Sequence, residues 1–286
     1  MDGVIVIDKP AGVTSHDVVA VARRSLRERR IGHTGTLDPL ATGVLPLACG
    51  RATRLVRFLT SSDKDYLATI RFGLTTDTYD VTGTPLTSTD ARPTPDAIEQ
   101  AVTALRGEYL QAPPAYSAKK IGGTRAYALA RRDQTVVLAP VPVSVTRAEL
   151  IECTADEAVV AITCSAGFYV RAFAQEVGRM AGVGACLAAL RRTRSGQFTI
   201  DNAVGLDRLQ AEGAAPPGFV AIDDLLQDFP AVRVTPEVRQ RIAHGREIDA
   251  QAAAAWSRVV DEEGHLVAVA TPGSRPGLLH PSVVLI

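Results

Sequence analysis

The sequence has few cysteines, and none of them stands in an arrangement that binds a metal. There are four in 286 residues, namely Cys49, Cys153, Cys164 and Cys186. Zinc ligands come in closely spaced Cys and His pairs, and disulfide frameworks belong to short secreted chains. The sequence also has no P-loop and no G-x-G-x-x-G fingerprint. We therefore expect reduced thiols, no metal and no cofactor.

Long apolar runs are also missing. No run approaches the roughly 20 residues needed to span a bilayer, and the segment from Met1 to Lys9 carries two aspartates. A secretory signal would need a basic region followed by a long apolar stretch. We expect a soluble, cytoplasmic protein with no membrane partner.

A net charge is absent too, since 31 Lys and Arg balance 31 Asp and Glu. The distribution is uneven: residues 1–60 hold nine basic against five acidic side chains, residues 104–147 seven against two, and residues 207–286 seven against eleven. Local positive potential binds polyanions even on a neutral protein. RNA is therefore a candidate partner, although ordinary solvated surface charge is the simpler explanation of these numbers alone.

What is present is an uneven alternation of strand and helix signals. Val4 to Ile7 is a β-branched run that ends in a turn, and Thr94-Pro95-Asp96 has the order of cap, proline and acidic residue that begins a helix, here expected to run to about residue 106. Irregular interleaving of this kind favours an α+β fold over regular βαβ winding. The composition changes near Phe229, which predicts one domain at residues 1–228 and a small β-rich domain at residues 229–286.

One non-periodic segment, residues 33–50, carries an aspartate in an unusual setting. Asp38 precedes a proline, which disfavours a helical conformation. Gly35 and Gly43 permit close approach of the backbone to a ligand. Apolar neighbours would partly desolvate the carboxylate and make it more nucleophilic or more basic. On these grounds alone, an ordinary turn aspartate is the more common explanation.

The same segment resembles the catalytic motif of the bacterial tRNA pseudouridine-55 synthases, the TruB family. Residues 35–45 fit the family pattern G-x-L-D-x-x-A-x-G-x-L. Five further segments resemble family landmarks in the family's order: D-K-P-A-G-V-T-S at 8–15, K-D-Y at 64–66, Q-A-P-P-A-Y-S-A-K-K at 111–120, G-F-Y-V-R at 167–171 and L-R-R at 190–192. The resemblance is dense over residues 2–200 and thins afterwards.

The resemblance implies a fold and an activity. The fold would be that of pseudouridine synthases, with a mixed, largely antiparallel central sheet flanked by helices, an RNA-gripping loop at about residues 108–134 and a PUA-like RNA-binding domain at residues 229–286. The activity would be isomerisation of uridine 55 in the tRNA T-arm stem-loop to pseudouridine, with the uridine flipped out of its stack first. The chain would act as a monomer without a guide RNA.

The resemblance also implies site residues. Asp38 would be the covalent nucleophile, attacking either C6 of the base or C1′ of the ribose, and Arg171 the cation that keeps it ionised and aimed. Tyr66 would stack on the uracil and handle the C5 proton. The remaining substrate-binding residues are His33 in the space of the flipped bases, Tyr169 and Leu190 as pocket walls, Asp80 (with Asp77 as the alternative) as a polar group, and Lys9. Phosphate contacts would come from the arginines of residues 23–30 and the basic side chains of residues 119–132.

Three other interpretations stay open. A non-catalytic RNA-binding module or tRNA folding chaperone would explain the basic segments but would leave Asp38 and Arg171 without a role. A synthase that depends on a guide RNA would share the same motifs. A carboxylate hydrolase is a more distant alternative, because no motif places a second acid beside Asp38.

Overall fold

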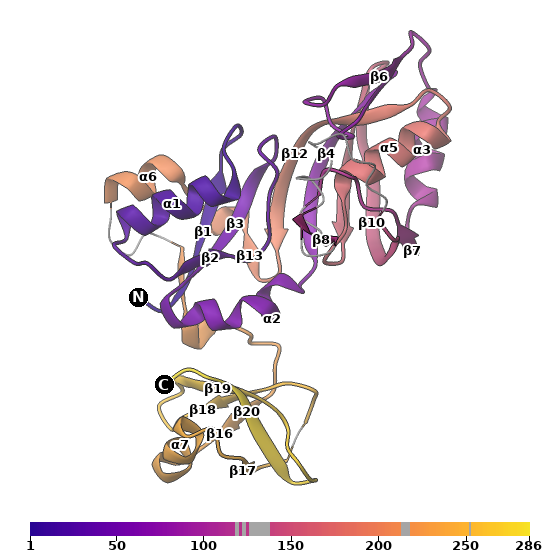
Figure 1. Cartoon of the computed structure of the whole chain (residues 1–286). Helices are drawn as coiled ribbons and strands as arrows, with labels where there is room; N and C mark the ends of the chain where they lie inside the picture. Colours follow the sequence, from indigo (N-terminus) through magenta and orange to yellow (C-terminus); the bar gives the residue numbers. More distant parts are fainter. Residues whose placement is uncertain (118–119, 122–123, 126–137, 213–217, 252) are drawn as a thin grey trace.

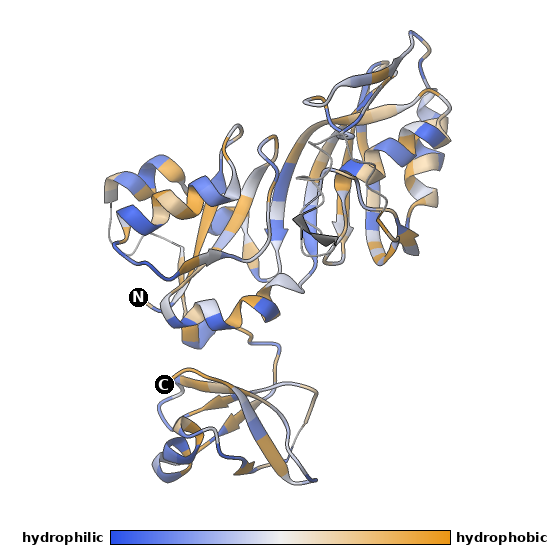
Figure 2. Ribbon diagram, viewed as in Figure 1, coloured by the Kyte–Doolittle hydropathy of each residue, from blue (hydrophilic) through white to orange (hydrophobic). Residues whose placement is uncertain are grey.

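The computed structural model of the chain describes residues 1–117, 120–121, 124–125, 138–212, 218–251 and 253–286 (Figure 1). It shows a large sheet with helices packed on it and a separate small sheet that contains the C-terminus. The apolar residues follow the strands of both sheets, while the helices show hydrophilic outer faces (Figure 2). In the part of the chain that is described, no helix has the length and apolar character needed to cross a membrane.

The large sheet is mixed and mostly antiparallel. Its main path runs through β14 (Val204–Gly205), β1 (Gly3–Lys9), β3 (Thr42–Cys49), β12 (Ala185–Ser195), β4 (Lys64–Phe72), β11 (Glu157–Cys164), β10 (Val141–Cys153) and β7 (Gly107–Gln111). Three short strands pair off this path: β2 (Ile31–His33) with β3, β13 (Phe198–Thr199) with β12, and β15 (Phe219–Ala221) with β1. Among the described strands of this sheet, only the β1–β14 and β3–β12 pairs are parallel. The α+β fold class expected from the sequence is confirmed.

Two groups of helices pack on this sheet. At one end α1 (Ser15–Ser25) lies against α6 (Leu206–Glu212), and at the other α3 (Pro95–Ala104) lies against α5 (Val170–Met180) (Figure 1). The helix predicted from Thr94-Pro95 is α3, and the Thr94 hydroxyl accepts a hydrogen bond from the backbone of Ala97, as a cap should. A capping box between Thr14 and Asp17 begins α1 within the last two residues of the first family landmark.

Two shorter hairpins lie outside the sheets. One joins β5 (Leu74–Thr76) to β6 (Pro85–Ser88), and the other joins β8 (Lys120–Ile121) to β9 (Thr124–Arg125). The second belongs to the predicted RNA-gripping loop. Residues 118–119, 122–123 and 126–134 of that loop, and the basic side chains expected at residues 119–132, lie outside what the structure describes.

The C-terminal module is a five-stranded sheet with its own core. It runs in the order β16 (Ala231–Arg233), β18 (Ser257–Val260), β19 (Leu266–Pro272), β20 (Leu278–Val284) and β17 (Ile248–Asp249), and α7 (Pro236–Ala243) packs against it. The β-rich character predicted for the tail is thus confirmed. The division at residue 228 stays an interpretation, although the chain passes between the two sheets just before β16.

The C-terminal module is fastened to the large sheet through the segment that follows β3. This segment comprises the 3-10 helix η1 (Gly50–Leu55) and α2 (Val56–Thr60). The Phe58 ring lies edge-on to Trp256 at 4.8 Å and to Phe229 at 5.7 Å. Arg51 and Arg54 donate to the backbone carbonyls of Leu285 and Val284. One continuous run of chain therefore joins the Asp38 segment to the C-terminal module.

Candidate active site

Asp38 lies on the irregular loop between β2 and β3, and the backbone of this loop is held from both sides. The buried Ser15 hydroxyl accepts a hydrogen bond from Leu37 N at 2.9 Å and donates to Leu37 O at 3.0 Å. Gly12 N donates to Pro39 O at 2.8 Å. The Asp38 side chain is 43% exposed. A fixed backbone thus presents a carboxylate that a ligand is able to reach.

Arg171 is the cation next to this carboxylate. Its Nε lies 2.9 Å from Asp38 Oδ2, while the Arg171 side chain is only 8% exposed. Its other nitrogens donate to the carbonyls of Thr78 at 2.9 Å and Tyr116 at 2.8 Å. The residue sits in the first turn of α5, so a rigid helix and two carbonyls fix the planar guanidinium in one orientation. Arg171 is therefore placed to orient Asp38.

A second carboxylate also faces Arg171. Asp80 Oδ2 lies 3.6 Å from Arg171 Nη1, and Asp80 is buried. The other Asp80 oxygen accepts from Thr82 N at 3.0 Å and from the Thr78 hydroxyl at 2.9 Å. The alternative, Asp77, accepts from Thr84 N at 2.7 Å and shows no ion pair with Arg171 in the described structure. Of the two candidates, the geometry thus brings Asp80 to the site.

The backbone around Asp80 is strained. Tyr79 has φ of +65°, a left-handed conformation that costs a residue with a side chain on the order of 1 kcal/mol. This conformation lets the Thr78 carbonyl and the Asp80 carboxylate converge on Arg171. Strain retained at such a point is consistent with a functional constraint.

Tyr66 and Leu190 come from the adjacent strands β4 and β12. Both are largely buried, at 8% and 9% exposed. Burial disfavours the phenolate and raises the Tyr66 pKa, and the positive charge of Arg192 opposes this shift. Arg192 is the cross-strand partner of Tyr66 and is itself 1% exposed. In the sequence, Arg192 stood out only as a member of the L-R-R landmark, and it was not predicted to lie in the site.

Tyr169 lies just before α5, and its backbone is held by the side chain of Gln111, which was not predicted to lie in the site. Gln111 accepts from Tyr169 N at 2.8 Å and donates to Tyr169 O at 3.1 Å. Burial raises the pKa of the Tyr169 phenol. Gln111 belongs to the Q-A-P-P landmark, so the signal was present in the sequence, but nothing there indicated a backbone partner.

Lys9 requires a correction to the predicted role. It is fully buried, and its ammonium group donates to Val13 O at 2.7 Å, Pro10 O at 2.9 Å and Pro39 O at 3.4 Å. Burial lowers its pKa to about 8, while the charge of Asp38 acts in the opposite direction. Because these carbonyls surround the ammonium group, the structure does not support direct contact with a nucleotide. Lys9 instead supports the loop next to Asp38.

His33 ends β2 at the start of the Asp38 loop. Its ring lies edge-on to His16 at 5.5 Å between centroids, and its buried Nδ1 has no hydrogen-bond partner among the described residues. Burial, reinforced by the positive charges of His16 and Arg192, lowers its pKa. The imidazole is therefore neutral near physiological pH. This suits a ring that packs against bases.

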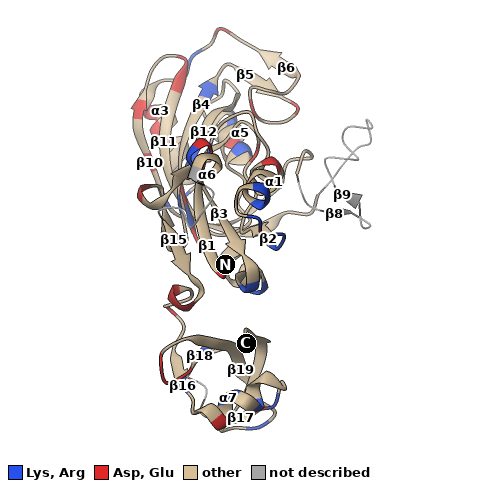
Figure 3. Ribbon diagram, turned by 90° about the vertical axis from the view of Figure 1, so that its left-hand side faces the viewer, with Lys and Arg blue, Asp and Glu red and all other residues tan. Residues whose placement is uncertain are grey.

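Lys and Arg residues lie close together along α1 and the stretch between α1 and β2 (Figure 3). The five arginines predicted to contact phosphates, Arg23, Arg24, Arg27, Arg29 and Arg30, are all exposed. Arg23 also donates to Ile31 O at 2.7 Å, which links this face to the strand that leads into the Asp38 loop. A polyanion bound here would lie beside the loop.

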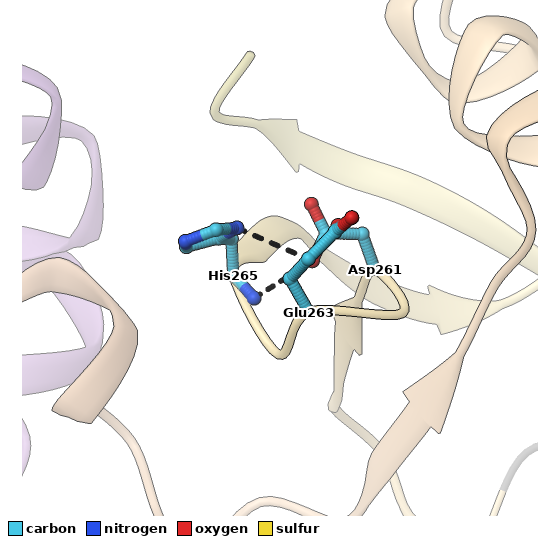
Figure 4. A group of neighbouring side chains, drawn as sticks. All are labelled: Asp261, Glu263 and His265. Atoms are coloured by element: carbon cyan, nitrogen blue, oxygen red, sulfur yellow. Dashed lines mark hydrogen bonds and ion pairs between the residues drawn. The ribbon is translucent and has the colours of Figure 1, made fainter.

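One group of side chains in the described structure has donors suited to a metal. Asp261, Glu263 and His265 bring their ligand atoms within 4.8 Å of one another in the C-terminal module (Figure 4). Asp261 already accepts from His265 N at 2.8 Å and lies 3.8 Å from the cation of Arg239. Because these contacts occupy the one buried carboxylate, we assign no metal to this group.

Comparison with known proteins identifies the family. A model described as "TruB family pseudouridylate synthase (N terminal domain)" matches residues 23–170, and one described as "tRNA pseudouridylate synthase B C-terminal domain" matches residues 171–227. A tRNA pseudouridine synthase B of Solibacter usitatus is 44% identical over all of both chains. One of Mycobacterium sp. (strain KMS) is 46% identical over 86% of this chain and 84% of its own.

Solved structures give the same fold. A Cbf5-Nop10-Gar1 complex matches with a TM-score of 0.75 and 25% identity, and an H/ACA RNP bound to a substrate RNA containing 2′-deoxyuridine matches with 0.74 and 23%. Each match covers 99% of this chain and 85% of the other. Fold and family models together define a pseudouridine synthase, which is an isomerase. Within that class, the chain belongs to the TruB family of pseudouridylate synthases.

Proposed function

We propose that this enzyme converts uridine 55 in the T-arm of tRNA to pseudouridine, with Asp38 as the covalent nucleophile. The observation that carries the proposal is the pair formed by the half-exposed Asp38 carboxylate and the buried Arg171 guanidinium at 2.9 Å. The tRNA substrate is supported by the curated relatives, which are named tRNA pseudouridine synthase B.

The chemistry needs one nucleophile and a route for protons. The N1–C1′ bond of uridine breaks, the uracil turns, and a C5–C1′ bond forms; one proton leaves C5 and one is added at N1. Covalent attack by Asp38 divides this into two easier steps. Arg171 orients the carboxylate for attack through the ion pair at 2.9 Å. Attack at C6 and attack at C1′ are both compatible with the position of Asp38.

The uridine must leave its stack before any of this happens. Extrusion of a base costs a few kcal/mol, which contacts to the extruded nucleotides must offset. We assign the neutral His33 ring to the space that the bases vacate, and Tyr66, Tyr169 and Leu190 to the walls around the uracil. The exposed arginines of residues 23–30 supply phosphate contacts, which provide affinity but no base specificity. The C-terminal module would either grip the acceptor arm or cap the catalytic domain.

The test is release of tritium from C5-labelled tRNA. Asp38→Asn keeps the size of the side chain and removes the nucleophile, so we expect release to disappear while tRNA binding persists. Asp90→Asn, an exposed aspartate after β6, is the matched control and should release tritium at the parent rate. Turnover by Asp38→Asn would contradict the assignment and favour a non-catalytic RNA-binding role.

A second candidate is a synthase that depends on a guide RNA or on partner proteins, because one solved neighbour is an H/ACA RNP bound to a substrate RNA and another is a complex of Cbf5 with Nop10 and Gar1. We infer that this chain acts alone, since a curated relative that matches its full length is named tRNA pseudouridine synthase B. The purified chain should modify a bare T-arm stem-loop without added protein or guide RNA. Activity that appears only on addition of such a partner would reverse this choice.

A further inference from the structure

Arg192 lies within the site, yet the proposed chemistry gives it no role. It is 1% exposed and sits on β12, where its backbone pairs with Tyr66 of β4 on one side and Gly43 of β3 on the other. Its position therefore joins the strand that carries the stacking tyrosine to the strand that follows the Asp38 loop.

The Arg192 guanidinium fastens both ends of that loop. Its Nε donates to Val44 O at 2.7 Å and its Nη2 donates to Gly35 O at 3.0 Å. Gly35 precedes Asp38 and Val44 follows it. Because the guanidinium is planar and rigid, these two bonds set the separation of the two ends.

Two glycines of the loop motif fit this arrangement. A Cβ on Gly43, whose φ is +97°, would lie 2.2 Å from the Arg192 backbone oxygen. A Cβ on Gly35 would lie 3.5 Å from Arg192 Nη1. The β3–β12 approach at Gly43 is thus too close for any side chain, and the loop backbone passes directly over the guanidinium.

The positive charge of Arg192 has no obvious structural reason. Among the described residues, no carboxylate forms an ion pair with it, and the backbone groups that it binds are carbonyl oxygens. A neutral amide would satisfy carbonyls without the cost of burying a charge, and arginine does not lose its proton in proteins. A function that uses the charge would explain why a cation is kept here.

We propose that Arg192 is a positioning residue of the active site, which holds both ends of the Asp38 loop and keeps a positive charge beside the Tyr66 hydroxyl. The inference rests on the proposed function, and adds to it that Tyr66 receives the C5 proton, as the family resemblance implies. In that step the electron pair of the C5–H bond re-forms the C5–C6 double bond as the bond between C6 and Asp38 breaks. If Asp38 attacks C1′ instead, the N1–C6 π electrons move to N1. The C5 proton passes to the Tyr66 oxygen, whose own proton goes to N1.

Three groups act on the Tyr66 hydroxyl, and each comes from a different part of the chain. Arg192 on β12 lowers its pKa through charge and a side-chain hydrogen bond, whereas burial, Cys164 on β11 and Asp38 in the loop all raise it. Arg171 on α5 offsets part of the Asp38 charge through their ion pair. Lys64 lies on β4 itself and donates to the carbonyls of Thr60 and Ser62. Arg192 is thus the main influence that keeps the phenol proton transferable.

Two variants separate the charge from the geometry. Arg192→Gln removes the charge and keeps a donor, whereas Arg192→Lys keeps the charge and loses the planar fork. Single-turnover rates on full-length tRNA are measured from about pH 6 to pH 9.5, the range that approaches the tyrosine pKa. We expect Arg192→Gln to lose on the order of 100-fold in rate at neutral pH, with the rise in rate moved to higher pH. Arg192→Lys should be slower than the parent but keep its pH dependence.

A third variant and a modified tyrosine complete the test. Arg192→Met fills the same space with an apolar chain and tests the loss of charge if Arg192→Gln does not fold, because an apolar replacement of a buried charge often preserves stability. Placing 3-fluorotyrosine, a more acidic phenol, at position 66 should restore part of the rate in either variant. A merely structural arginine predicts lower thermal stability, an unmoved pH profile and no such rescue, and that result would overturn the inference. Failure of the parent itself to modify tRNA would instead count against the proposed function.

Discussion

Lys9 offers a quantitative test of how the Asp38 loop is supported. Its folded-state pKa is lowered from 10.5 to about 8 by burial. Between these two values the unfolded chain binds a proton that the folded protein has lost, so stability rises with pH through this window. Below about pH 8 both states are protonated and this gain is absent. Lys9→Met has a side chain of similar length with no titratable group, so this variant should not gain stability as the pH rises.

The expected size of the effect follows from the difference between these two pKa values. From pH 7 to pH 9.5 such a group contributes at most ~2 kcal/mol, since a tenfold change in a protonation equilibrium corresponds to about 1.4 kcal/mol. We therefore expect the free energy of unfolding of the parent, relative to Lys9→Met, to rise by about 1–2 kcal/mol over this interval. Urea denaturation at the two pH values measures it. The exposed Arg29→Met, which removes a charge that does not titrate in this range, is the control. A parent-to-variant difference that stays flat with pH would refute the reasoning.

Three further predictions concern how the loop and the C-terminal module are held. Ser15→Ala leaves the N–H and C=O of Leu37 unpaired, so we expect a loss of about 1–3 kcal/mol in urea denaturation, and a lower kcat with unchanged tRNA affinity; unchanged kcat would show that the loop needs no such support. Gly43→Ala brings a Cβ within 2.2 Å of a backbone oxygen of β12 at a positive φ, so no folded protein should be recovered by circular dichroism. Trp256→Ala removes the half-buried ring packed on Phe58. The free energy of unfolding should fall by about 2 kcal/mol, and turnover on the T-arm stem-loop should not change. A loss of turnover on the stem-loop would mean that the C-terminal module acts on the catalytic loop.

The fold class was accessible from the sequence because it depends on local patterns, and the candidate site residues were predicted from ordered landmarks. The Thr94-Pro95 start of α3 and the β-rich tail needed only propensities. Asp38 was different, since its local chemistry favoured an ordinary turn, and only its place in a series of family landmarks singled it out. The structure then brought Arg171 within 2.9 Å of it, a contact between residues far apart in the chain that no spacing rule predicts.

The sequence did not distinguish residues that contact the substrate from residues that hold the loop, because both kinds stand in the same landmarks. Lys9, Ser15 and Arg192 each lie in a landmark, and each is buried with its polar atoms on loop backbone groups. An irregular loop has no neighbouring strand to satisfy its carbonyls and amides, so side chains must do so. Asp38 differs in being 43% exposed. Exposure, which only the folded chain reveals, therefore separates the proposed nucleophile from the polar residues that fix its position.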